Sequence, residues 1–194
     1  MNRNNDDFID QLVLFCKNAT QNRDESHGEA HMTNVRENAM VILQRLMECG
    51  EYPHLLQDTN TFHKIRKMAC AAAQFHDIAD HKYVKDPTQC GIENELLKYF
   101  SNEDADLIIK IMSAVSYSKE YKLRTESEVP FSFEESLGET GALIRDIVSD
   151  ADKIEAIGEI GVERCMEYAR EYMLKTNHRH GTEAEINAYL ISHA

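Results

Sequence analysis

The sequence predicts an all-α fold, and three observations support this prediction. Apolar residues recur every three or four positions along most of the chain, which is the spacing of one helical face. Only three prolines occur, at positions 53, 87 and 130, and each lies in a polar stretch. No alternating strand pattern, internal repeat or low-complexity segment is present. We therefore expect seven or eight helices in one compact domain, residues 1–194, in which C-terminal helices at 162–194 pack on a core of about 24–165.

The first half of the chain predicts three helices. Their apolar stripes contain Phe8, Leu12 and Phe15, then Val35, Ala39, Ile42 and Leu46, then Ile65, Ala69 and Ala72. Ser26 and Glu29 form the S-x-x-E pattern of a capping box, so we expect the second helix to begin there. Asn60 or Thr61 is the expected cap of the third helix. His76 continues the apolar stripe of that helix, which directs its side chain toward the core.

Further helices are expected after a polar connection. One short helix is predicted at about 92–100, and Ser101 with Asp104 indicates a capped start for the next, which extends to about residue 118. Residues 119–137 are rich in charge and contain Pro130. We therefore expect the longest loop of the chain there, in the position of a lid.

The last third of the chain returns to helical spacing. Apolar residues from position 143 to 154 define a helix that carries Asp152 beside its apolar face. Residues 162–175 are again helical in pattern, and Thr182 with Glu185 indicates the start of a short final helix.

Composition and charge exclude several classes of function. Apolar residues make up 42% of the chain, but no apolar run reaches the length of a membrane span and no signal-peptide pattern is present, so we expect a cytoplasmic protein without membrane association. The five cysteines are odd in number and far apart, which favours reduced thiols. The net charge is −13 and no basic run occurs, which argues against dedicated nucleic-acid binding. A small phosphorylated substrate stays compatible with this charge, because a bound divalent cation reverses the local field.

Four ionisable residues lie at the edges of three predicted apolar faces. They are His31, which precedes Val35 by one helical turn, the adjacent pair His76 and Asp77, and the distant Asp152. Burying such groups is costly unless a metal or a proton partner satisfies them. Each residue alone fits a purely structural role, but the combination suits a divalent transition metal such as Mn, Fe, Co, Ni or Zn, with Mg also allowed. Waters would complete an octahedron around these four ligands.

The same residues resemble the motifs of the HD-domain metal-dependent phosphohydrolases. The likeness covers most of residues 24–165 and includes Phe-His-Asp-Ile-Ala-Asp at 75–80 and Asp-Ala-Asp-Lys-Ile-Glu at 150–155, as in the small standalone HD hydrolases. In the first motif Gly28 replaces the aspartate that usually follows Ser-His. No histidine lies between His81 and His178, which favours one metal over two. The resemblance implies an enzyme that hydrolyses a small phosphorylated metabolite, with a nucleotide as the leading substrate, or alternatively a non-catalytic HD module that binds metal or nucleotide.

Other residues are expected around this site. Asp80 lies four positions after His76, which predicts either a base or orienter for water or a solvent-facing carboxylate. Lys82 and Lys119 are candidates for phosphate contacts, although solvated lysines fit the pattern equally well. The resemblance adds His27 as a substrate-binding residue, and it leaves a homodimer open.

Overall fold

The chain is built from helices, as the sequence predicts. The computed structural model describes residues 3–21, 28–78, 90–126 and 131–158, with isolated positions between 161 and 188. Within these residues the regular elements are α1 (Arg3–Thr20), α2 (Glu29–Glu48), α3 (Pro53–Leu56), α4 (Thr59–Phe75), α5 (Ile92–Leu96), α6 (Asn102–Ala114), α7 (Tyr117–Glu126) and α8 (Glu134–Glu155). The described residues contain no strand, and the all-α prediction is confirmed.

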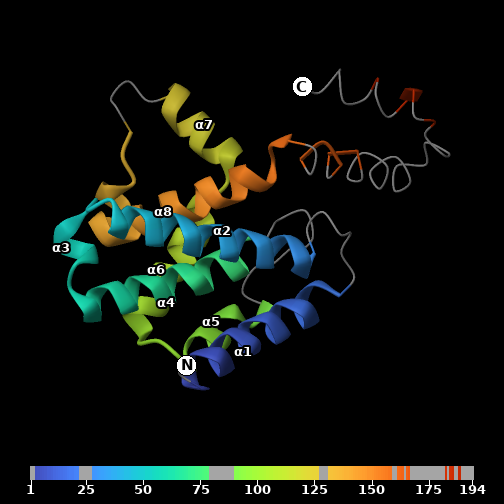
Figure 1. The fold of residues 1–194 in the computed structure, drawn as a ribbon. Coiled ribbons are helices and arrows are strands. Elements are labelled where there is room, and N and C mark those ends of the chain that lie inside the picture. The colour runs from blue at the N-terminus through green and yellow to red at the C-terminus, as the bar shows by residue number, and fades with distance from the viewer. Residues whose placement is uncertain are drawn as a thin grey trace.

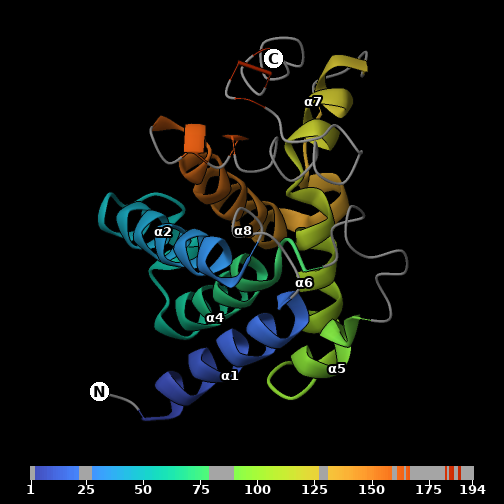
Figure 2. The same cartoon turned by 90° about the vertical axis from the view of Figure 1, so that its right-hand side faces the viewer.

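Helix α4 forms the centre of the bundle. It packs against α1, α2, α6 and α8, and α2 also lies along α8 (Figures 1 and 2). Every residue from Met68 to Phe75 is buried, including the run of three alanines at 71–73. A helical segment that is buried on all sides lies in the interior, and alanine side chains allow neighbouring helices to approach closely. The end of α4 therefore delivers the next residue, His76, into the core.

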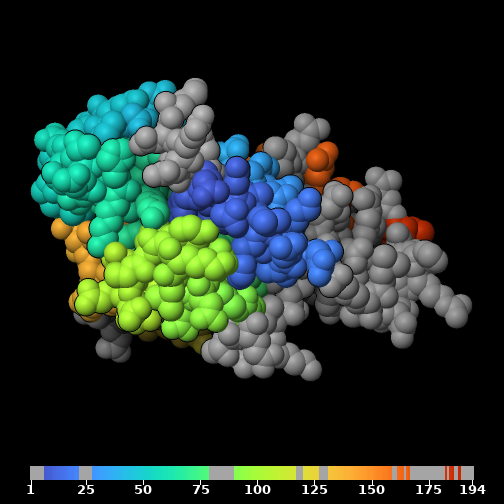
Figure 3. All heavy atoms as spheres, turned by 90° about the horizontal axis from the view of Figure 1, so that it is seen from below, coloured from blue at the N-terminus to red at the C-terminus, as the bar shows by residue number. Residues whose placement is uncertain are grey.

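Aromatic residues join the N-terminal helix to the α5 region. On the face in Figure 3, α1 lies beside the segment around α5. The ring of Phe8 meets those of Tyr99 and Phe100 edge to face, at centroid distances of 5.1 and 6.0 Å. Lys67 of α4 places its Nζ 5.0 Å from the centre of the Phe8 ring and donates to the carbonyl of Tyr99. These contacts close one side of the bundle over α4.

Of the predicted starts of α2, α4 and α6, one is right and two are displaced. Ser101 is the N-cap of α6, and its hydroxyl accepts a hydrogen bond from the Asp104 amide at 3.2 Å. The N-cap of α4 is Asp58, whose carboxylate accepts from the Thr61 amide, so the prediction of residue 60 or 61 is wrong by two or three positions. The N-cap of α2 is Gly28, without a side-chain cap, so the predicted capping box does not open this helix.

The prediction of a long loop at 119–137 is wrong. Residues 117–126 form α7, and α8 begins at Glu134. The sequence of α7 has no apolar stripe, and polar contacts hold it instead. Glu120 accepts from Arg124 within α7 at 2.8 Å and from the buried Arg145 of α8 at 2.6 Å. Helix α6 also ends at Ala114, before the predicted residue 118.

The ends of the chain are described only in part. The cap predicted at Thr182 is present. The Thr182 hydroxyl accepts from the Glu185 amide at 3.4 Å, and the Glu185 carboxylate accepts from the Thr182 amide at 2.7 Å and from its hydroxyl at 2.9 Å. Within the described residues no helix combines the length and the apolar character needed to cross a bilayer.

Candidate metal centre

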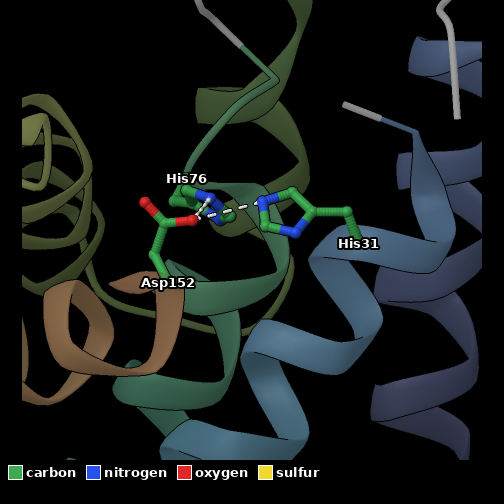
Figure 4. Close-up of side chains that lie close together, drawn as sticks. All are labelled: His31, His76 and Asp152. Carbon is green, nitrogen blue, oxygen red and sulfur yellow. Dashed lines mark ion pairs between the residues drawn. The ribbon is translucent and has the colours of Figure 1, made fainter. Parts of the chain in front are cut away.

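Three helices bring the predicted ligands together. His31 lies in the first turn of α2, His76 directly follows α4, and Asp152 lies in the last turn of α8 (Figure 4). Asp77 follows His76 in the turn after α4. Because α2 packs along both α4 and α8, the start of α2 and the ends of the other two helices meet at one end of the bundle.

The two histidines are buried, and the two carboxylates reach solvent. His31 is 3% exposed and His76 is 8% exposed. The side chains of Asp77 and Asp152 are 23% and 32% exposed. The imidazoles therefore lie on the core side of the cluster, and an ion or a substrate would reach it past the carboxylates.

The spacing of the donor atoms fits a shared cation. Asp152 Oδ1 lies 3.3 Å from His31 Nε2 and 3.7 Å from His76 Nε2, and Asp77 Oδ2 lies 3.8 and 3.6 Å from the same two nitrogens. Direct N–H···O hydrogen bonds are shorter, at about 2.7–3.2 Å. Two ligands at about 2.1 Å from one ion are about 3.0 Å apart at a right angle and about 3.4 Å apart at a tetrahedral angle. His31, His76 and Asp152 offer ligand atoms that all lie within 4.8 Å of one another, so this buried cluster could hold a metal ion.

A backbone contact sets the tautomer of His76. Its Nδ1 lies 2.8 Å from the carbonyl oxygen of Ala73. A carbonyl can only accept, so Nδ1 carries the hydrogen and Nε2 is directed at the carboxylates. Nε2 is buried and has no hydrogen-bond partner among the described residues. A histidine held through one nitrogen, with the other aimed at carboxylates, has the usual arrangement of a metal ligand.

The electrostatics of the cluster favour a positive charge at this position. Burial works to lower the pKa of His76, but the nearby Asp77 and Asp152 carboxylates outweigh it and raise the pKa to about 9. Burial likewise works to raise the pKa of Asp152, but the two imidazoles beside its carboxylate hold that pKa far below its usual range. A proton and a divalent cation are thus alternative occupants of the same negative environment.

The other predicted site residues lie outside the described residues or away from the cluster. His27, Asp80 and Lys82 lie outside the described residues. Lys119 lies in α7 rather than in a loop, and its side chain is not described. Asp150, two residues before Asp152, is exposed and accepts from Lys153 at 3.5 Å, so its carboxylate does not take part in the cluster.

Two polar links beside the cluster were not predicted from the sequence. Glu155 of α8 is buried and accepts hydrogen bonds from Asn34 and Asn38 of α2. The four-residue spacing of the two asparagines is the signal that places them on one face of α2. Periodicity did not indicate which residue they contact.

The second link joins α2 to α4 inside the core. Arg36 Nη1 donates to Gln74 Oε1 at 2.8 Å, and Gln74 Nε2 lies 3.5 Å from Thr33 Oγ1. Gln74 is fully buried and lies two residues before His76. This contact ties the segment that carries His76 to the helix that carries His31.

Comparison with known proteins found no relationship for this chain. Neither the family models, nor the curated proteins, nor the solved structures contain a match.

Proposed function

We propose that this protein is a metal-dependent phosphohydrolase that acts on a small phosphorylated metabolite, with a nucleotide as the leading substrate class. The observation that carries the proposal is the buried cluster of His31, His76 and Asp152, with Asp77 beside both imidazoles. The resemblance of the motifs to the HD-domain phosphohydrolases supports the choice of reaction.

In this proposal the three residues of the cluster and Asp77 hold the same cation. His31 and His76 would bind one divalent cation through Nε2, and Asp77 and Asp152 would bind it through carboxylate oxygens. When bound, the cation supplies Lewis acidity toward a phosphoryl oxygen and toward water. The hydrogen bond from His76 Nδ1 to Ala73 keeps the imidazole oriented throughout the reaction.

Neighbouring residues would handle the proton and the phosphate charge. In the proposal Asp80 orients the attacking water and accepts its proton. Lys82, Lys119 and His27 would contact phosphate oxygens and stabilise the negative charge of the transition state. This positive charge is needed locally, because the chain as a whole carries a net charge of −13.

Metal analysis and a phosphate-release screen test the proposal. The purified protein should contain or bind a divalent cation and release phosphate or pyrophosphate from one of a panel of nucleotides with Mn²⁺, Mg²⁺, Ni²⁺ or Co²⁺. Asp152→Asn should weaken metal binding and lower turnover. Asp150→Asn is the matched control, because it makes the same change two residues away on a solvent-exposed side chain.

Two results would contradict the proposal. Failure of the wild-type protein to bind any of these cations would remove its basis. Tight metal binding without hydrolysis of any phosphorylated substrate would instead indicate a regulatory binding module.

A further inference from the structure

The last turn of α8, which carries Asp152, and the residues just after it leave their large apolar side chains partly exposed. Ile154 is 44% exposed, and Ile157 just beyond the helix is 67% exposed. Among residues 152–158, Glu155 is the one side chain that is buried. A carboxylate at a helix C-terminus is also unfavourable, because it meets the negative end of the helix dipole. The position of Glu155 therefore needs an interaction that compensates for both its burial and its charge.

Two asparagines of α2 provide that interaction. Asn38 Nδ2 donates to Glu155 Oε1 at 3.1 Å, and Asn34 Nδ2 donates to Glu155 Oε2 at 3.2 Å. Each carboxylate oxygen thus has its own amide donor, and both donors come from one helix. Hydrogen bonds to an ionised acceptor are stronger and more directional than those between neutral groups. We refer to Asn34, Asn38 and Glu155 as the carboxamide clamp.

The clamp lies on the same pair of helix faces as the metal ligands. Asp152 and Glu155 are three residues apart on α8, and His31 and Asn34 are three residues apart on α2, so each pair shares a face. The contact between Asp152 Oδ1 and His31 Nε2, at 3.3 Å, is therefore one helical turn from the clamp on both helices. A shift of α8 along α2 would change both contacts together.

We propose that the carboxamide clamp positions Asp152 for metal binding by fixing the last turn of α8 on α2. The three residues are positioning residues, since they act through Asp152 and do not ligate the ion themselves. The inference rests on the proposed metal centre and deepens it, because it assigns the preorganisation of that centre to a contact between two helices. Removing hydrogen bonds made directly to metal ligands typically weakens metal affinity by about 10–100-fold, and for this contact one turn from the ligand we expect the lower end of that range.

An isosteric exchange tests the clamp. Asn38→Asp places a second carboxylate against Glu155, and Glu155→Gln places an amide against the Asn38 amide. The double variant restores the pairing with donor and acceptor reversed, because the introduced glutamine would accept from Asn34 and donate to the introduced aspartate. Net charge and side-chain volume of the pair stay the same. Affinity for Mn²⁺ alone would be measured by calorimetric titration, together with thermal unfolding of the metal-free proteins.

We expect Asn38→Asp to weaken Mn²⁺ binding about 10-fold or more and the double variant to recover most of the wild-type affinity. Asp58→Ala is the matched control, because it removes the N-cap of α4 and lowers stability far from the clamp. It should leave Mn²⁺ affinity unchanged. If Asn38→Asp lowers the unfolding temperature but keeps wild-type affinity, the clamp is only structural and the inference is wrong.

Mn²⁺ affinity and phosphohydrolase activity, measured on the same variants, distinguish failure of the inference from failure of the proposed function. Metal affinity that follows the clamp in a protein without phosphohydrolase activity would support the inference and contradict the proposed enzyme. A wild-type protein that binds none of Mn²⁺, Mg²⁺, Ni²⁺ and Co²⁺ would overturn both.

Discussion

The buried ion pair between Arg145 and Glu120 should make the stability of this protein depend on acid pH. Arg145 is 1% exposed, and its guanidinium donates to Glu120 of α7 at 2.6 Å and to the carbonyl of Ala114 at 2.9 Å. The same guanidinium lies 4.0 Å from the centre of the Phe133 ring. Arg145 of α8 thus connects the end of α6 to Glu120 of α7, a helix that has no apolar stripe of its own.

The size of the effect follows from the pKa of Glu120. Burial works to raise this pKa, but hydrogen bonds from Arg145 and Arg124 outweigh it and lower the pKa from 4.5 to about 2. A depressed carboxyl pKa stabilises the folded state above the unfolded value and loses that contribution as pH falls through the folded value. The stabilisation is therefore full above about pH 4.5 and disappears toward pH 2. The shift corresponds to about 3 kcal/mol.

Urea unfolding of Glu120→Gln at several pH values tests this reasoning. At pH 7 the variant should be less stable than the wild type by about 3 kcal/mol, because the buried guanidinium loses its one buried carboxylate partner and keeps only the exposed Asp146, at 2.9 Å. The difference should shrink as pH falls below 4.5, since a protonated glutamate resembles glutamine. Glu126→Gln, on an exposed side chain of the same helix, is the control and should change little. A difference that stays constant from pH 7 to pH 2 would show that the ion pair does not supply this stability.

Three further predictions concern the cluster and its surroundings. Mn²⁺ at about 100 times its dissociation constant should stabilise the wild type by about 2.7 kcal/mol in thermal unfolding, and Asp152→Asn should lose this shift. Ser149→Ala should leave stability unchanged or raise it by about 1 kcal/mol, because the buried Ser149 hydroxyl has no hydrogen-bond partner among the described residues. A marked fall in unfolding temperature would show that this hydroxyl makes a stabilising hydrogen bond. Asp80→Asn should keep its metal content while turnover falls about 10²–10⁴-fold, whereas Asp77→Asn should lose metal. Loss of metal from both variants would indicate that Asp80 is a metal ligand.

The parts of the fold that the sequence predicted are those encoded locally. The apolar stripe through Ile65, Ala69 and Ala72 is buried as expected, and the cap at Ser101 forms its predicted hydrogen bond. Both signals depend on residues that are close in sequence, so they can be recognised without knowledge of the tertiary structure. The failure at α7 has the same origin. Its sequence lacks a stripe, and its main support comes from Arg145, which lies 25 positions away.

The candidate site also contains residues that the sequence predicted and residues that it did not. Ionisable groups at the edges of apolar faces are rare, and their burial is costly without a partner. The sequence offers few such partners for His31, His76 and Asp152 besides one another, and the structure brings the three together. Asn34 and Asn38 carry no such signal, because an asparagine on a partly exposed helix face is satisfied equally well by water. Their role appears only when Glu155 is seen to be buried against them. A site of this kind can therefore be recognised from the residues whose burial is costly, whereas the contacts that hold those residues in place emerge only from the packing of α8 on α2.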